Sequence, residues 1–359
     1  MKVVVVDDSP IARAAIRSIL ESDTEIQVVA EVSDSRDALP SIARHRPNLV
    51  AIDLHMPNVA GLELISELMQ VYPVPIVVIT GSDDGNLALE AVNRGALEVT
   101  TKPDLFKTTA GEVFRARVRE LARMPVIRRP RPAADDRNSA VSPPPSQPSP
   151  LPIEGVATEF RSSDVRPIEV LAIGASAGGP SAIVELLSGL PKRLPIPVLL
   201  VQHISSSFSE SFLNYLSNCS PIPVAYASEL TMLKPGHLLV APPDRHLRAV
   251  SRLSASATRG IAVDNNLPSA TALLTSVADV FGPRAAGVLL SGMGSDGASG
   301  LLEMRRRGAL TIVQRSPAVD GMPRAALEHG AAAWCLSVAE IARMVSACAI
   351  GDEPGRRVR

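Results

Sequence analysis

Short apolar runs recur along the first third of this chain, with room for one helix between each pair. We expect them to form strands at residues 3–6, 26–29, 49–52, 76–79 and 97–99. The segments between them carry apolar residues at helical spacing, for example over residues 62–69. Strands that are apolar on both faces and alternate with helices belong to parallel sheets that helices cover on both sides. The sequence therefore predicts an α/β fold with a doubly wound, five-stranded parallel sheet.

Polar side chains stand where these expected strands end. In chain order they are Asp7 and Asp8, Asp53, Thr80 and Lys102. The carboxyl ends of parallel strands share one edge of the sheet, so these side chains converge there. Converging carboxylates repel one another unless a cation lies among them, and Mg²⁺ prefers such oxygen ligands. A helix cap or a solvated side chain explains each residue alone, but the full set favours a phosphoryl-transfer site.

Four motifs in this region resemble those of the receiver domain of two-component response regulators. They are Asp7-Asp8, Asp53-x-x-Met56-Pro57, Thr80 and Lys102-Pro103. The resemblance implies a flavodoxin-like fold with Asp53 as the phospho-acceptor and Thr80 and Lys102 as phosphoryl contacts. It also implies that Mg²⁺ is bound by Asp7, Asp8, Asp53 and the backbone carbonyl of His55. A histidine kinase would supply the phosphoryl group.

Two positions depart from the receiver pattern. Ala60 stands where the family usually has Asp, and Val99 stands where an aromatic switch residue is common. The chemistry of phosphorylation survives both changes. We therefore expect phosphorylation at Asp53 without a relay that depends on an aromatic side chain.

A proline-rich segment separates two expected domains. Residues 125–166 are rich in Pro and Ser and include three consecutive prolines at 143–145, which favours an extended linker over helix or strand. We expect a receiver domain at 1–124, this linker, a second domain at 167–350 and a charged tail at 351–359. A chain of 359 residues is long enough for two domains.

The charge of the chain argues against some classes of partner. The formal net charge is −1, so no overall basic character points to nucleic acid or to an anionic membrane surface. At the N-terminus, Val3–Val6 is followed at once by Asp7, which fits neither a signal peptide nor a membrane span. We expect a cytoplasmic protein with no nucleic-acid partner and no direct membrane insertion.

The second domain opens on a strand followed by a turn rich in small residues. The apolar run Val170–Ile173 leads into Gly174–Gly178, which has a G-x-S-x-G spacing around Ser176. Such a turn lifts a serine hydroxyl off the end of a sheet and leaves backbone N–H groups free to face an oxyanion. A phosphate-binding loop or a close-packed turn fits the same spacing. A nucleophilic Ser176 therefore requires His and Asp side chains at the ends of neighbouring strands.

Two later residues meet that requirement. His203 ends the next apolar run, and we expect its strand to lie beside the Ser176 strand. Asp296 lies just beyond a third run, where its carboxylate could accept a hydrogen bond from the imidazole and fix the tautomer of the ring. Of the other histidines in this domain, His246 flanks an apolar run, and we expect it to face solvent.

The segment around Asp296 admits a second interpretation. Gly292, Gly294 and Gly297 spell G-x-G-x-x-G between a strand and a helix, which is the pattern of a dinucleotide-binding loop. No acidic residue follows about twenty positions later to bind a ribose. We therefore favour a catalytic loop in which the backbone amide of Met293 binds an oxyanion, with a nucleotide-binding switch as an alternative.

Several motifs of the second domain resemble the bacterial chemotaxis protein-glutamate methylesterases. They are Gly174–Gly179, Gln202-His203, Ala241–His246, Gly292–Gly297 and Gly321-Met322-Pro323. The order Ser176, His203, Asp296 differs from the α/β-hydrolase order, and the resemblance implies a Rossmann-like α/β domain instead. One block, Asn265–Thr271, departs, because the family more often has Arg before its Pro-Ser pair and Asp two residues after it. We expect this change to lie away from the three catalytic candidates and to affect substrate fit and turnover.

The resemblance implies a hydrolase that removes methyl esters from glutamate side chains of methyl-accepting chemoreceptors and deamidates receptor glutamines. Ser176 would attack, His203 would act as the base and Asp296 would orient it, with no metal or other cofactor in the esterase domain. Phosphorylation of the receiver would control this reaction in chemotaxis adaptation. The alternative is a phosphorelay regulator whose second domain is catalytically inactive and only binds a partner.

Overall fold

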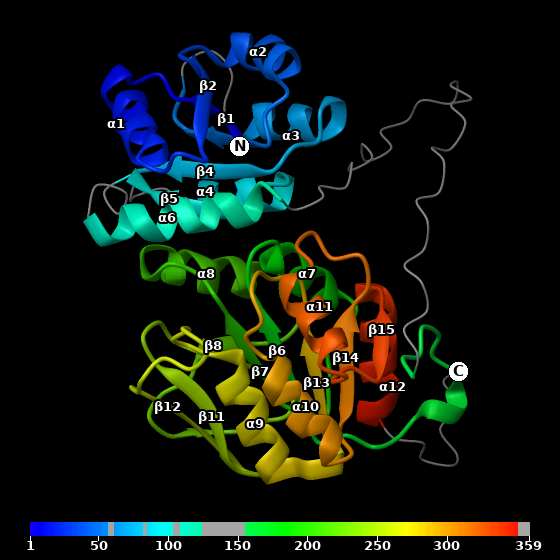
Figure 1. The fold of residues 1–359 in the computed structure, drawn as a ribbon. Coiled ribbons are helices and arrows are strands. Elements are labelled where there is room, and N and C mark those ends of the chain that lie inside the picture. The colour runs from blue at the N-terminus through cyan, green and yellow to red at the C-terminus, as the bar shows by residue number, and fades with distance from the viewer. Residues whose placement is uncertain (57–60, 82–84, 103–107, 124–154, 351–359) are drawn as a thin grey trace.

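The computed structural model describes residues 1–359 except 57–60, 82–84, 103–107, 124–154 and 351–359. Figure 1 shows two α/β domains, with the N-terminal domain packed against one side of the larger C-terminal domain. Most of the expected linker and all of the expected tail lie outside the described residues, as does Ala60. No helix in the described ranges is long and apolar enough to cross a lipid bilayer.

The N-terminal domain confirms the predicted doubly wound fold. Its described strands form a five-stranded parallel sheet in the order β2-β1-β3-β4-β5, the flavodoxin-like order. The strands are β1 (Lys2–Val6), β2 (Gln27–Val32), β3 (Leu49–Ile52), β4 (Ile76–Thr80) and β5 (Glu98–Thr101). The helices are α1 (Pro10–Glu21), α2 (Ala38–His45), α3 (Gly61–Val71), α4 (Gly85–Arg94) and α6 (Thr108–Leu121).

The alternation of side chains along β1 explains why helices cover both faces of this sheet. Val3 and Val5 contribute to one buried cluster, and Val4 and Val6 to another. A strand that is apolar on both sides is stable only between two helical layers. The edge strands β2 and β5 extend further than their apolar runs suggested, because partly exposed residues also pair there.

The C-terminal domain is built on a seven-stranded parallel sheet in the described residues, ordered β15-β14-β13-β6-β7-β10-β8. Its strands are β6 (Val170–Ala175), β7 (Val198–Gln202), β8 (Val224–Tyr226), β10 (Leu238–Val240), β13 (Ala285–Leu289), β14 (Leu310–Gln314) and β15 (Trp334–Leu336). A smaller antiparallel sheet comprises β9 (Thr231–Met232), β11 (His246–Ser251) and β12 (Ser254–Thr258). The helices are α7 (Gly179–Ser188), α8 (Ser209–Cys219), α9 (Ala270–Phe281), α10 (Ala298–Arg306), α11 (Gly321–Glu328) and α12 (Val338–Ile350).

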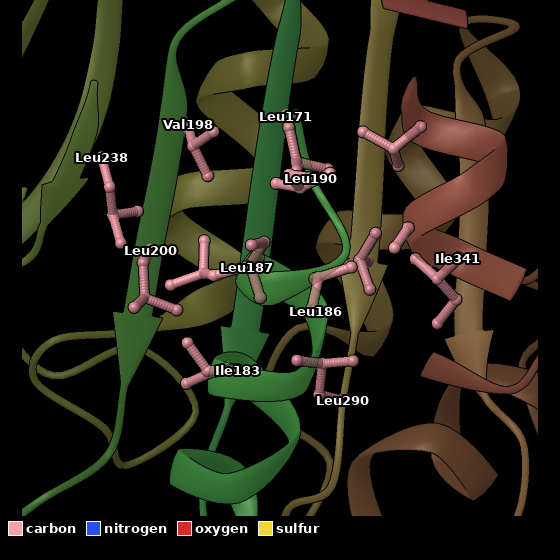
Figure 2. Close-up of a cluster of buried hydrophobic side chains, with 14 of the residues drawn as sticks. Leu171, Ile183, Leu186, Leu187, Leu190, Val198, Leu200, Leu238, Leu290 and Ile341 are labelled. Atoms are coloured by element: carbon pink, nitrogen blue, oxygen red, sulfur yellow. The ribbon is translucent and has the colours of Figure 1, made fainter. Parts of the chain in front are cut away.

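Helix α7 packs on this sheet through the leucine and isoleucine stripe of its buried face. Figure 2 shows Leu187 of α7 near Leu200 of β7, and Ile183 of α7 and Leu171 of β6 belong to the same buried cluster. All four side chains are fully buried. Because α7 begins directly after the Ser176 turn, this packing fixes the turn relative to the sheet.

The strand register brings the candidate residues to one edge of the sheet. Ala175 of β6 pairs with Gln202 of β7, the residue before His203. On the other side of β6, Gly174 pairs with Leu289, the last residue of β13. The segments that carry Ser176, His203 and Asp296 therefore leave three adjacent parallel strands at the same end, as expected from the sequence.

The two domains meet through α4 of the N-terminal domain and the helices α7 and α8 (Figure 1). The hydroxyl of Tyr215 on α8 donates to Oδ1 of Asn93 at 2.8 Å, and Ser181 on α7 donates to the same oxygen at 3.3 Å. Leu89 of α4 is buried within the core cluster of the second domain. The N-terminal domain thus covers the end of the second sheet where the candidate residues lie.

The packing of α7 makes a testable prediction about stability. Leu187→Ala should lower the unfolding free energy of the C-terminal domain by about 2–5 kcal/mol, because it removes a fully buried side chain and leaves a cavity. Denaturant titration of the full chain measures the shift. Leu230→Ala is the matched control, since Leu230 is 65% exposed and its truncation should change stability by less than about 0.5 kcal/mol.

Candidate active site

Ser176 lies in the tight turn between β6 and α7. The turn is closed by Gly178, which has a φ of 69°, a left-handed conformation that glycine adopts without strain. The amide of Ser176 donates to the carbonyl of Ser291 at 3.0 Å. Its Oγ is buried and has no hydrogen-bond partner among the described residues. The serine hydroxyl is therefore held in place by its backbone and is free to react.

The loop that carries Met293 lies directly against Ser176. A Cβ built on Gly292 would come within 3.0 Å of the Cβ of Ser176 and 2.2 Å of Sδ of Met322, so any larger residue would require these side chains to move. The loop is fixed by hydrogen bonds from Gly292 N–H to the carbonyl of Val319 and from Met322 N–H to the carbonyl of Gly292. Met293 follows Gly292 immediately in sequence, and its role as an oxyanion donor stays a prediction.

His203 and Asp296 form a hydrogen-bonded pair. Nε2 of His203 lies 2.8 Å from Oδ2 of Asp296. Because an ionised carboxylate only accepts, Nε2 carries the hydrogen and Nδ1 is the ring nitrogen that can take a proton. Ser176 and His203 line the same cavity, but the serine hydroxyl makes no hydrogen bond to the ring. Of the three expected residues the structure joins two and places the third beside them; catalytic contacts of this kind often tighten only with substrate.

The carboxylate of Asp296 receives three further hydrogen bonds from the start of α9. Oδ1 accepts from Ser269 Oγ at 2.7 Å and from Thr271 N–H at 2.9 Å, and Oδ2 accepts from Ala270 N–H at 2.7 Å. Burial opposes the charge on Asp296, but the hydrogen bonds from His203, Thr271 and Ser269 outweigh it and hold the pKa of this carboxyl below its ordinary value.

The expectation that the block Asn265–Thr271 lies away from the catalytic candidates was therefore wrong. Its first four residues, Asn265–Pro268, line the same cavity as Ser176 and His203, and its last three hold Asp296. Sequence reasoning treated the block as a departure from a pattern. The available signal was Ser269, which stands at the cap position before an apolar helical run, where backbone N–H groups are free to bind an anion.

Gln202 is a second residue that the sequence reasoning did not select for a role. Its Nε2 donates to the carbonyls of both Ser176 and His203, each at 2.8 Å. The side chain is buried and so links the backbone of the serine turn to that of the histidine. A polar residue at the end of an otherwise apolar strand was the sequence signal for this contact.

The expected acidic cluster of the receiver comes together at the ends of β1 and β3. Oxygens of Asp7, Asp8 and Asp53 all lie within 4.8 Å of one another. Lys102 Nζ lies 2.6 Å from Asp53 Oδ2 and 2.9 Å from Asp7 Oδ2. Burial raises the pKa of the Asp7 carboxyl above its ordinary value despite the hydrogen bond from Lys102. One lysine facing three carboxylates leaves an excess of negative charge, which fits an oxygen-bound divalent cation such as Mg²⁺.

The other expected receiver residues are His55 and Thr80. The backbone N–H of His55 donates to Oδ1 of Asp53 at 3.2 Å, which places the His55 backbone next to the acidic site. Thr80 ends β4 and is fully buried, and its Oγ1 has no hydrogen-bond partner in the described ranges. A buried hydroxyl of this kind is suited to contact an added phosphoryl oxygen.

A cavity of about 350 Å³ lies between the two domains. Ser176, His203 and Asn265 border it from the second domain, and Val99 and Glu98 border it from the receiver. The side chain of Glu98 is paired with Arg117 of α6 at 2.6 Å. Position 99 thus contributes an aliphatic side chain to a surface that faces the candidate catalytic residues.

Comparison with known proteins relates both domains to described families. Residues 3–109 match the response regulator receiver domain, and residues 171–345 match the CheB methylesterase domain. A protein-glutamate methylesterase/protein-glutamine glutaminase 3 of Anaeromyxobacter dehalogenans is 37% identical, over 92% of this chain and 94% of its own. The chain belongs to the CheB methylesterase family. A second member, the protein-glutamate methylesterase/protein-glutamine glutaminase 3 of Hahella chejuensis, is 38% identical over 96% of this chain and 98% of its own.

A solved structure belongs to the same family. The catalytic domain of the Thermotoga maritima CheB methylesterase is 28% identical and covers 50% of this chain and 97% of its own, with a TM-score of 0.48. Membership in the CheB family confirms the resemblance and the two-part fold class inferred from the sequence motifs.

The charge excess at the receiver site predicts a response to metal. Asp7 has a raised pKa when folded, so it contributes stability below its ordinary pKa and loses that contribution as pH rises through the folded value. Mg²⁺ binds the ionised form of this carboxylate, which is more populated at higher pH. Mg²⁺ should therefore raise the melting temperature of the receiver, and more at about pH 7.5 than at about pH 5. Calorimetry of the full chain measures this.

The matched variants for the metal response are Asp7→Asn and Asp34→Asn. Asp7→Asn should stabilise the metal-free receiver at neutral pH and abolish the rise in melting temperature with Mg²⁺. Asp34 is not one of the clustered carboxylates, and its side chain pairs with Arg36, so its replacement should leave the response intact. An unchanged Mg²⁺ response in Asp7→Asn would contradict the assignment.

Proposed function

We propose that the second domain hydrolyses methyl esters of glutamate side chains in chemoreceptors through Ser176, His203 and Asp296. The observation that carries the proposal is the His203–Asp296 pair at 2.8 Å, in the same cavity as a buried serine whose hydroxyl is unengaged in the described structure. The relatives named protein-glutamate methylesterase/protein-glutamine glutaminase align over nearly the whole chain, which supports the same substrate class.

In the proposed reaction Ser176 Oγ attacks the ester carbonyl carbon while Nδ1 of His203 takes the hydroxyl proton. Asp296 stabilises the resulting imidazolium through Nε2–H. The tetrahedral oxyanion binds backbone amides that include that of Met293, each donor contributing about 3 kcal/mol. Collapse expels the methoxy group, which leaves as methanol with the proton from His203. Water, deprotonated by His203, then releases the glutamate and restores the serine.

The same steps act on a glutamine side chain, with ammonia as the leaving group. We therefore include receptor deamidation in the proposal and expect both reactions to occur in the cytoplasm. No feature of the described residues favours an inactive, partner-binding domain. The nucleotide-binding alternative is disfavoured because the carboxylate of Asp296, within the glycine-rich loop, is already bound by His203 and by the start of α9.

Replacement of the nucleophile tests this proposal. Ser176→Ala should reduce methanol release from a methylated receptor fragment by about a million-fold, to background, because no acyl-enzyme can form. The matched control is Ser205→Ala, which changes a serine that borders the same cavity and should retain activity. Retention of methanol release by a folded Ser176→Ala protein would refute the assignment.

We further propose that the receiver, residues 1–124, controls the esterase domain, residues 167–350. A histidine kinase would phosphorylate Asp53, with Mg²⁺ held by Asp7, Asp8, Asp53 and the carbonyl of His55, and with Lys102 and Thr80 contacting the phosphoryl oxygens. Bound Mg²⁺ would neutralise charge at the phosphoryl group. Support comes from the position of α4 against α7 and α8 and from the receiver residues that border the cavity containing Ser176. Phosphorylation would favour an arrangement in which substrate reaches the serine.

The control proposal predicts a dependence on a small phosphodonor. Acetyl phosphate with Mg²⁺ should raise the esterase rate of the full chain at least about tenfold, which corresponds to a coupling free energy within the usual range for two linked sites. Asp53→Asn should retain the basal rate and lose the activation, whereas Asp34→Asn should behave as the wild type. An equal activation in Asp53→Asn would contradict phosphorylation at this residue.

A further inference from the structure

His246 is the last residue of the motif Ala241–His246, and the mechanism above gives it no role. It was expected to face solvent, but it begins β11 and is only 2% exposed, so that expectation was wrong. Its Nε2 lies 2.9 Å from the carbonyl oxygen of Ile261, and its Nδ1 lies 3.3 Å from the backbone N–H of Ser269. A carbonyl only accepts and a backbone N–H only donates. Nε2 therefore carries the hydrogen, and the ring is neutral.

Ser269, which His246 contacts, is fully buried and caps the N-terminus of α9. Its Oγ accepts a hydrogen bond from Ala272 N–H at 3.2 Å, as a helix cap does. The hydroxyl hydrogen is directed elsewhere, to Oδ1 of Asp296 at 2.7 Å. The side chain of Ser269 therefore both caps the N-terminus of α9 and donates to Asp296, which binds His203.

The contacts form one continuous path, from the carbonyl of Ile261 through His246, Ser269 and Asp296 to His203. Each link is a hydrogen bond with a defined direction. We propose that Ser269 is a positioning residue for the esterase reaction, held by His246, which orients Asp296 and withdraws negative charge from it. This inference rests on the proposed catalytic role of His203 and Asp296.

The position of Ser269 determines how its removal should act. It does not border the cavity that contains Ser176, so it should affect turnover and leave substrate binding nearly unchanged. His203 is the titratable side chain that hydrogen-bonds to Asp296 in the described structure; the other donors are Ser269 Oγ and the amides of Ala270 and Thr271. Loss of the hydroxyl donor leaves more negative charge facing the imidazole, which favours its protonated, inactive form.

A purely structural role for Ser269 makes a different prediction, and α9 supplies a matched control. Ser276 lies on the same helix and is also buried. Its Oγ donates to the carbonyl of Leu273 and accepts from Ala249 N–H, so its contacts hold α9 against β11. If buried serines of α9 act only on stability, Ser269 and Ser276 variants should have similar effects on catalysis.

The experiment measures methanol release by the full chain, with acetyl phosphate present, as a function of substrate concentration and pH. Ser269→Gly removes the donor while glycine still serves as a helix cap, and Ser269→Cys keeps the volume with a weak donor. We expect kcat to fall at least about tenfold with KM nearly unchanged, and the acidic limb of the kcat/KM profile to move to higher pH. Ser276→Ala should leave kcat and this limb in place.

Variants of His246 test the other half of the path. His246→Phe removes the acceptor for Ser269 N–H and should produce the same change in kcat and in the acidic limb. His246→Asn places a side-chain oxygen near the position of Nδ1 and should restore part of the activity. Circular dichroism and thermal unfolding establish that each variant is folded before its kinetics are compared.

The outcomes separate this proposal from the proposed function. If the wild type and Ser176→Ala are equally active or inactive, the esterase assignment fails. If the wild type is active and requires Ser176 but folded Ser269→Gly or Ser269→Cys keeps the wild-type kcat and pH profile, the positioning role is overturned. It is also overturned if neither Ser269 variant folds, because the residue is then structural.

Discussion

The buried carboxylate of Asp296 is the group around which the candidate active site is organised. An ionised acid with 2% of its surface exposed is stable only if its oxygens are fully hydrogen-bonded. Three donors come from the first residues of α9, where the free backbone amides and the helix dipole favour negative charge. The fourth is His203. The carboxylate of Asp296 thereby connects the start of α9, the end of β7 and the loop after β13.

The same edge of the sheet also determines how the two domains are related. Parallel strands place the candidate catalytic residues at their carboxyl ends, and the receiver packs over that end through α4. Val99 and Glu98 of β5 border the cavity that contains Ser176, and Lys102, which binds Asp53, directly follows β5. One short strand therefore connects the acidic site of the receiver to the surface facing the serine. Lys102 is close enough to this surface that a change in its position could alter the surface, with no need for an aromatic switch residue at position 99.

The features predicted from sequence are those that strand pattern and strand order determine. Apolar runs revealed the parallel strands, and residues that follow such strands necessarily gather at one edge. This is why Asp7, Asp53 and Lys102 in one domain, and His203 and Asp296 in the other, were identified before their contacts were known. The sequence does not determine whether Ser176 and His203 are hydrogen-bonded, and in the structure they are not. The orientation of a side chain at this precision depends on local packing and on substrate.

The residues that sequence reasoning missed act through contacts between segments distant in the chain. Ser269 reads locally as a helix cap, and nothing nearby indicates that its hydroxyl reaches a carboxylate 27 residues away. The departure at Thr271 has a similar explanation. Its hydroxyl donates to Asp264 Oδ2 and accepts from Gly297 N–H, both at 2.8 Å, so it joins the residue before Asn265 to the residue after Asp296. The family more often has a carboxylate at position 271. In this chain the hydroxyl of Thr271 contacts the loop at Gly297, and it is itself bound to the carboxylate of Asp264, seven residues earlier.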